Sequence, residues 1–102
     1  MSGGAYAASK AGVMVFTKSL AAELAPDIRA NVICPGAATT PMGNAALAAM
    51  DEAGRAAFMK RYAIGRFSRP DEVANAILFL TADESSSITG IALAVDGGRT
   101  FH

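Results

Sequence analysis

The sequence predicts an α/β fold in which helices alternate with buried parallel strands, and three observations support this prediction. Apolar residues recur every three or four positions near the start of the chain, which is the pattern of a helix with one buried face. Two short, mostly apolar runs end in Pro-Gly or Gly-Gly pairs, as strands buried on both faces do. Helix-favouring segments separate these runs, as parallel crossover connections require.

The first helix is expected over residues 5–25, because Pro26 ends its periodic pattern. The apolar stripe of this helix consists of Val13, Phe16, Leu20 and Leu24. We expect this stripe to be the buried face. The run "IRANVIC" predicts a strand over residues 28–34, closed by the pair Pro35-Gly36.

The middle of the chain, residues 41–64, is rich in Ala and Met and favours helix, with Gly54 as the expected break. A clear start signal follows and predicts a helix over residues 70–82. The signal consists of Ser68, Pro70, Asp71 and Glu72. The run "GIALAVDGG" predicts the last strand over residues 90–96. Two strands are too few for a parallel sheet with both faces and its neighbours covered, so residues 1–102 are expected to form a single partial domain.

Composition excludes several classes of function. Nine basic and nine acidic residues give a net charge of zero, which argues against nucleic acid or an anionic membrane as a partner. No apolar run approaches the ~18 residues of a membrane-spanning helix, so we expect a cytoplasmic protein. The one cysteine, Cys34, offers neither a disulfide within the chain nor metal-ligand spacing; we expect a small buried side chain and no metal site.

Tyr6 and Lys10 are the candidate catalytic pair, because side chains four positions apart on a helix leave the same face. A phenol with a pKa near 10 is a poor base at neutral pH, but a nearby cation lowers that value by roughly 1–3 units. Lysine is common, however, and roughly one tyrosine in fifteen has a lysine four residues later by composition alone. Taken by itself, the pair is therefore also compatible with an ordinary helix surface.

Four motifs resolve this ambiguity: "YAASKAG", "NVICPGAATTPM", "RPDEVANAILFLTADES" and "ITGIALAVDGG". In this order and at this spacing they resemble the C-terminal half of the classical short-chain dehydrogenases/reductases, over essentially the whole chain. The resemblance implies the C-terminal part of a Rossmann-like, doubly wound parallel sheet with the order helix–strand–helices–strand. The glycine-rich turn of the N-terminal dinucleotide-binding half has no counterpart in these 102 residues.

The resemblance also implies roles for individual residues. Tyr6 matches the tyrosine that exchanges a proton with the substrate oxygen, and Lys10 matches the lysine that lowers its pKa and binds the nicotinamide ribose. Pro35 and Gly36 match the turn that passes close to the nicotinamide, where a residue without Cβ leaves room for the ring.

Two further positions match cofactor-binding positions of the family. Ala38 stands where the family often has Ile or Val, whose backbone contacts the carboxamide, and Thr40 matches a threonine that binds the carboxamide or the diphosphate. For Thr40, a role as a helix cap remains the alternative. The region between Met42 and Tyr62 matches a mobile lid over the substrate, although its apolar residues also suit plain helix packing. Those residues are Ala45, Leu47, Met50 and Met59.

These implications together predict an NAD- or NADP-dependent oxidoreductase that transfers a hydride between its cofactor and an alcohol or ketone. The family also implies a homo-oligomer, formed through the helix at 5–25 and the C-terminal strand. A truncated, non-catalytic fragment or an oligomerisation module remains the alternative. An epimerase or dehydratase that uses the same Tyr-Lys pair is the rival within the enzymes.

Overall fold

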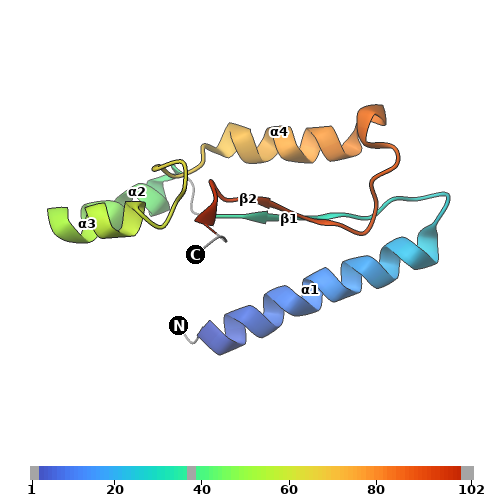
Figure 1. The fold of residues 1–102 in the computed structure, drawn as a ribbon, viewed down its shortest axis with the longest axis horizontal. Coiled ribbons are helices and arrows are strands. Elements are labelled where there is room, and N and C mark those ends of the chain that lie inside the picture. Colours follow the sequence, from blue (N-terminus) through green and yellow to red (C-terminus); the bar gives the residue numbers. More distant parts are fainter. Residues whose placement is uncertain (1–2, 37–38, 100–102) are drawn as a thin grey trace. The chain divides into compact units, whose positions relative to one another are not determined.

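The computed structural model describes residues 3–36 and 39–99; the side chain of Tyr6 and the whole of Ala38 lie outside this description. The elements are α1 (Gly3–Leu24), β1 (Val32–Pro35), α2 (Pro41–Ala48), α3 (Glu52–Met59), α4 (Pro70–Thr81), a 3₁₀ turn (Asp83–Ser85) and β2 (Ala92–Val95) (Figure 1). β1 and β2 pair as a two-stranded parallel sheet. The predicted α/β class and the order helix–strand–helices–strand are confirmed.

The chain divides into two compact units. The first consists of residues 1–32 and 79–93, and the second of residues 33–78 and 94–102. The sheet contributes to both, because Val32 donates to Ile91 in the first unit and Gly36 donates to Val95 in the second. No helix of the described residues has the length and apolar character needed to cross a membrane.

In the first unit, polar side chains hold the segment that leads into β2. The Arg29 guanidinium donates to the carbonyls of Leu80 at 2.8 Å and Ile88 at 2.9 Å. The amide group of Asn31 donates to Ile88 O and accepts from Ile91 N, both at 3.1 Å. These bonds occupy backbone groups that are outside the strand ladder, so residues 29–31 act as a side-chain clamp on residues 88–91.

This clamp explains why β1 begins at Val32 and not at residue 28. The N–H groups of Asp27 and Ile28 both donate to Leu24 O, at 3.1 and 3.0 Å, which forms a turn directly after α1. The following residues meet residues 88–91 through the side chains of Arg29 and Asn31, and through one backbone bond from Gly90 N to Ala30 O at 2.7 Å, before regular strand pairing starts. β2 is likewise shorter than residues 90–96: Gly90 has a φ of +77°, outside the strand region, and Asp96 already belongs to the turn that Gly98 N closes on its carboxylate.

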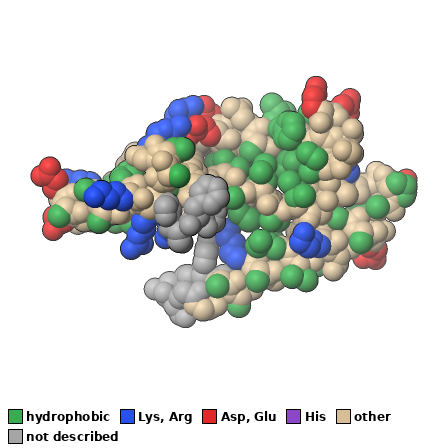
Figure 2. Space-filling model, viewed as in Figure 1, with side chains coloured by type: hydrophobic (Ala, Val, Ile, Leu, Met, Phe, Trp, Pro, Cys, Tyr) green, Lys and Arg blue, Asp and Glu red, His purple; other side chains and the backbone are tan. Residues whose placement is uncertain are grey.

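The predicted buried stripe of α1 is wrong for Val13 and Phe16, whereas Leu20 and Leu24 are half-buried. Thr17 and Ala21 are the buried residues of the described helix, at 8% and 4% exposure, whereas Val13 and Phe16 are 48% and 64% exposed. Ala21 lies against Gly90, where an added Cβ would sit 3.4 Å from the Ala21 Cβ. Backbone this close to Ala21 leaves room there only for a small side chain. Figure 2 shows apolar side chains at the surface along α1.

The second unit contains α2, α3 and most of α4, and here the helix break lies at Met50-Asp51 and not at Gly54. Asp51 is the N-cap of α3, and its carboxylate accepts from Gly54 N at 2.7 Å. A Cβ at Gly54 would lie only 2.9 Å from that oxygen, so the glycine serves the cap. Arg55 donates to the carbonyls of Met50 at 2.6 Å and Leu47 at 3.4 Å, which closes the end of α2.

We expect Arg29→Ala to lower the free energy of unfolding by about 1.5–3 kcal/mol, because it leaves two half-buried carbonyls without their charged donor. Urea unfolding followed by circular dichroism measures this change. Lys18→Ala is the control, since it removes an exposed bond to Gly90 O and should cost about 0.5 kcal/mol or less. Equal losses for the two variants would contradict the clamp.

Candidate functional site

The structure places the predicted site residues in two groups. Tyr6 and Lys10 lie on α1 in the first unit, on one continuous helix from Gly3 to Leu24. Pro35, Gly36 and Thr40 lie in the second unit, at the end of β1 and the start of α2. The side chain of Tyr6 and the whole of Ala38 are outside the described residues, so their predicted roles stay predictions.

Thr40 is the N-cap of α2, as the alternative for this residue proposed. Its backbone is extended (φ −114°, ψ 165°) and its hydroxyl oxygen accepts from Gly43 N at 3.1 Å, with Pro41 at the first helical position. The preceding residue is held as well, because Thr39 N donates to Ser68 O at 2.9 Å. A hydroxyl that accepts one bond still has a proton to donate, so capping is compatible with binding a ligand oxygen.

Gly36 follows β1 and is needed for space. Its φ is outside the left-handed region, but a Cβ there would lie 2.9 Å from Asp96 Cβ, 3.1 Å from Asp96 Cα and 3.4 Å from Tyr62 Cε2. The family resemblance predicts that this glycine leaves room for a cofactor ring. The structure supplies a reason from the chain itself: Asp96 and Tyr62 already occupy the side where a Cβ would be.

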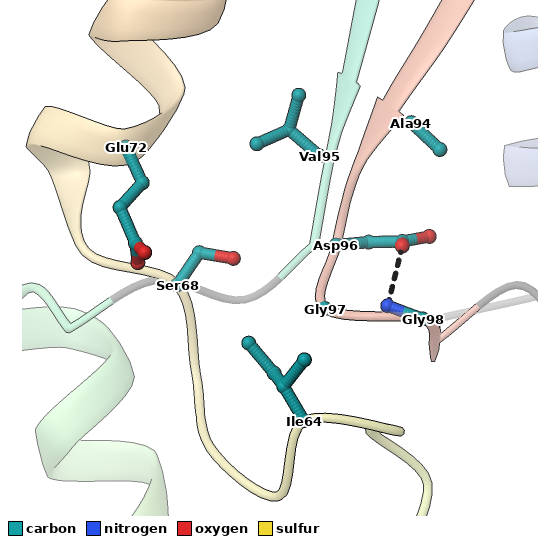
Figure 3. A pocket seen from close by; sticks show the side chains of 8 residues that line it. All are labelled: Ile64, Ser68, Glu72, Ala94, Val95, Asp96, Gly97 and Gly98. Carbon is teal, nitrogen blue, oxygen red and sulfur yellow. Dashed lines mark hydrogen bonds between the residues drawn. The ribbon is translucent and has the colours of Figure 1, made fainter.

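The second unit contains a hollow of about 360 Å³ beside the carboxyl end of β2, which the sequence analysis missed (Figure 3). Its lining residues are Ile64, Ser68, Glu72 and the run Ala94–Gly98. Carboxyl ends of parallel strands are the usual edge for ligands in α/β sheets. The sequence signals were present separately, in the start signal of α4 and in the "DGG" run, but sequence spacing does not bring them together.

Glu72 carries a fixed negative charge at this hollow. Its two carboxylate oxygens accept from the Arg66 guanidinium at 2.8 and 3.0 Å, and Oε1 also accepts from Arg69 N at 2.7 Å. The hydrogen bonds from Arg66, followed by the one from the Arg69 backbone, lower the pKa of Glu72 to about 2. A carboxylate this acidic does not exchange protons near neutral pH, so Glu72 is no candidate for acid/base catalysis.

The chain belongs to the short-chain dehydrogenase/reductase family: residues 1–100 match the family model described as enoyl-(acyl carrier protein) reductase. It is 48% identical over 94 residues to the 3-oxoacyl-[acyl-carrier-protein] reductase FabG of Thermotoga maritima, covering 91% of this chain and 37% of that protein. It is 44% identical over 98 residues to the 4-formylbenzenesulfonate dehydrogenase TsaC1/TsaC2 of Comamonas testosteroni, covering 94% of this chain and 39% of that protein.

Solved structures agree with this assignment. An oxidoreductase of the short-chain dehydrogenase/reductase family from Burkholderia thailandensis matches with a TM-score of 0.83 and 43% identity, over 96% of this chain and 38% of that one. The ligand-free aldohexose dehydrogenase of Thermoplasma acidophilum matches with a TM-score of 0.81 and 35% identity, over 97% of this chain and 42% of that one. The Rossmann-like fold is confirmed, and the chain spans about two-fifths of its relatives.

We expect Thr40→Ala to destabilise α2 by about 1 kcal/mol, because Gly43 N loses its acceptor at the helix start. Thr40→Ser keeps the hydroxyl and should retain most of this stability. Hydrogen exchange at the Gly43 amide is the direct measurement, and it should accelerate in the alanine variant only. Equal exchange in both variants would remove the capping role.

We expect Glu72 to make stability depend on pH between its ordinary pKa, 4.5, and its value in the fold, about 2. The folded pKa is the lower one, so the contribution is complete above 4.5 and is lost as the pH falls through about 2. Urea unfolding of the wild type and of Glu72→Gln should therefore differ most near neutral pH and converge in acid. Repeating the pair in an Arg66→Gln background should shrink the difference; an unchanged difference would show that Arg66 is not its cause.

Proposed function

We propose that this chain carries the acid/base part of an NAD(P)-dependent oxidoreductase that transfers a hydride between a nicotinamide cofactor and an alcohol or ketone. The observation that carries the proposal is family membership over residues 1–100, together with Tyr6 and Lys10 four positions apart on one helix. The names of three relatives support the alcohol/ketone class: a 3-oxoacyl-[acyl-carrier-protein] reductase, a cis-4-hydroxycyclohexanecarboxylate dehydrogenase and a cyclopentanol dehydrogenase. A cytoplasmic location belongs to the same proposal.

Tyr6 exchanges the proton in the proposed reaction. During reduction its phenol donates a proton to the carbonyl oxygen as that oxygen gains charge, and during oxidation the phenolate removes the hydroxyl proton. The Lys10 ammonium, one helical turn later, stabilises the phenolate and keeps its pKa closer to the working pH. A bound nicotinamide cofactor supplies or accepts the hydride.

Pro35, Gly36, Ala38 and Thr40 border the nicotinamide in this proposal. The described members of this set suit the role: Pro35 is exposed at the end of β1, and Thr40 is half-buried with a hydroxyl proton left after capping. The N-terminus of α2 adds a partial positive charge beside Thr40, which favours oxygen atoms of a ligand. Both NAD and NADP are compatible with these residues.

A second candidate function is an oligomerisation module without catalytic activity. The specific observation in its favour is that α1 carries exposed apolar residues: Val13, Val15 and Phe16 are 48%, 64% and 64% exposed. Where exposed apolar side chains form a contiguous patch, they mark a contact surface. A homo-oligomer that joins through α1 and the C-terminal strand is compatible with either function, so oligomer formation alone does not distinguish them.

The deciding experiment joins this chain to the N-terminal part of the Thermotoga maritima reductase, in place of the 37% of that protein that the chain matches. We expect NADH- or NADPH-dependent reduction of ketones by the fused protein. Tyr6→Phe should lower its kcat by about 10²–10⁴-fold, because the ring stays and the transferable proton is lost. Oxidation of the reduced cofactor, followed at its absorbance maximum, measures the rate.

The matched control is Tyr62→Phe, the same change at the second tyrosine of the chain. It should leave kcat near that of the unmodified fusion. A folded fusion that is inactive, or equally active with Phe at position 6, would reject the catalytic proposal. Mixed oligomers of the 102-residue chain with the intact relative, in the absence of activity, would then favour the oligomerisation module.

A further inference from the structure

The turn after β2 packs directly against the turn after β1. Gly36 N donates to the carbonyl oxygen of Val95, the last residue of β2, at 3.2 Å. Asp96 follows Val95 and lies very close: a Cβ added at Gly36 would be 3.1 Å from the Asp96 Cα. Ordinary carbon–carbon contacts are near 3.5–4.0 Å. Because the opposing atoms are Cα and Cβ, no change of rotamer relieves the contact. The position of Gly36 is thus set by the backbone of Asp96.

Asp96 is itself held firmly. It is 6% exposed, its Oδ1 accepts from Gly98 N at 3.0 Å, and its carbonyl accepts from Arg99 N at 3.1 Å. Gly97 and Gly98 have φ of +62° and +84°, which glycine adopts without strain. The carboxylate therefore stabilises a tight turn, visible in Figure 3. Asp96, the first residue of this turn, is the residue that packs against Gly36.

The loop after α3 supports the same turn from another side. Ile64 N donates to Gly97 O at 3.0 Å, and a Cβ at Gly97 would lie 2.7 Å from Ile64 Cγ1. Tyr62, 4% exposed, packs its ring against Gly36 and against the rings of Phe58 and Phe67, with centroids 6.0 and 5.4 Å away. Gly36 therefore sits between the Asp96 turn and a three-ring aromatic cluster.

We propose that Asp96 is a positioning residue for the nicotinamide site: its carboxylate locks the Asp96–Gly98 turn, and that turn fixes the backbone of Gly36. This inference rests on the proposed function, in which Pro35 and Gly36 border the nicotinamide. It gives the "DGG" run, which in the sequence only ends the last predicted strand, a role in the geometry of hydride transfer. Rates of such reactions are sensitive to placement, and a shift near 1 Å can cost about 10²-fold.

The first test needs no cofactor and uses the 102-residue chain. Hydrogen exchange at the Gly36 amide should accelerate in Asp96→Ala, which frees Gly98 N, and should stay slow in Asp96→Asn, which keeps an oxygen acceptor of the same shape. Unchanged exchange in the alanine variant would overturn the proposal, whatever the activity of the protein.

The second test measures the KM for NADH or NADPH in the fused protein. Gly36→Ala should raise that KM and lower kcat, by up to about 10²-fold together, because Asp96 forces the turn to move. Asp96→Ala should change both in the same direction, and Asp96→Asn should restore them. A variant that is merely less folded loses active protein without a change in KM, which separates positioning from stability.

Gly12→Ala is the matched control, because an added Cβ at this helical glycine meets nothing within 4 Å. It should leave the KM unchanged. A normal KM in Gly36→Ala and Asp96→Ala, in a fusion whose rate depends on Tyr6, would reject the positioning role and leave the proposed function intact. A folded wild-type fusion without hydride transfer would instead reject the proposed function, and with it the role of Asp96 at the nicotinamide.

Discussion

The side chain of Asn31 supports the pairing of β1 with β2, because it bonds to backbone groups of the opposite segment as a strand residue would. The amide of Asn31 donates to Ile88 O and accepts from Ile91 N, so it occupies two backbone groups one residue before β1 begins. Arg29 donates to Ile88 O and to Leu80 O, so it connects the segment that precedes β1 to the end of α4 as well. Unpaired buried backbone groups are costly, so these bonds select the register in which the parallel strands meet.

At the carboxyl end of the sheet, the space available for a side chain restricts which residues fit, more than backbone conformation does. Gly36 has an ordinary φ, yet it has no room for a Cβ beside Asp96 and Tyr62. Gly97 has both a positive φ and a close neighbour in Ile64. Small residues here let two turns approach closely, which links the last strand to the segment that precedes α2. The same principle applies to α1, where Ala21 faces Gly90 while larger side chains stay outside.

The element order and the helix start at Pro70 were predictable, because local signals determine them. Pro70 begins α4, and Glu72 accepts from Arg69 N as the acidic half of a capping box does. The buried face of α1 was not predictable from periodicity. The residues Val13 and Phe16 of the stripe are exposed, whereas Thr17 and Ala21 are buried, and Ala21 lies against the backbone of Gly90 in the first unit. Periodicity shows which residues of a helix are apolar, but the neighbouring element determines which of those residues are buried.

The sequence by itself determined the family, the α/β class and the helix that carries Tyr6 and Lys10, because these depend on motifs and on spacing along one helix. It also gave both possible roles of Thr40, of which the cap is visible in the fold. Only the tertiary structure decided that Gly36 packs on Asp96 and that Ser68, Glu72 and the Asp96–Gly98 turn line one hollow. The physical reason is sequence distance: residues 36 and 96 meet only after the strands have paired, and no local pattern records that contact.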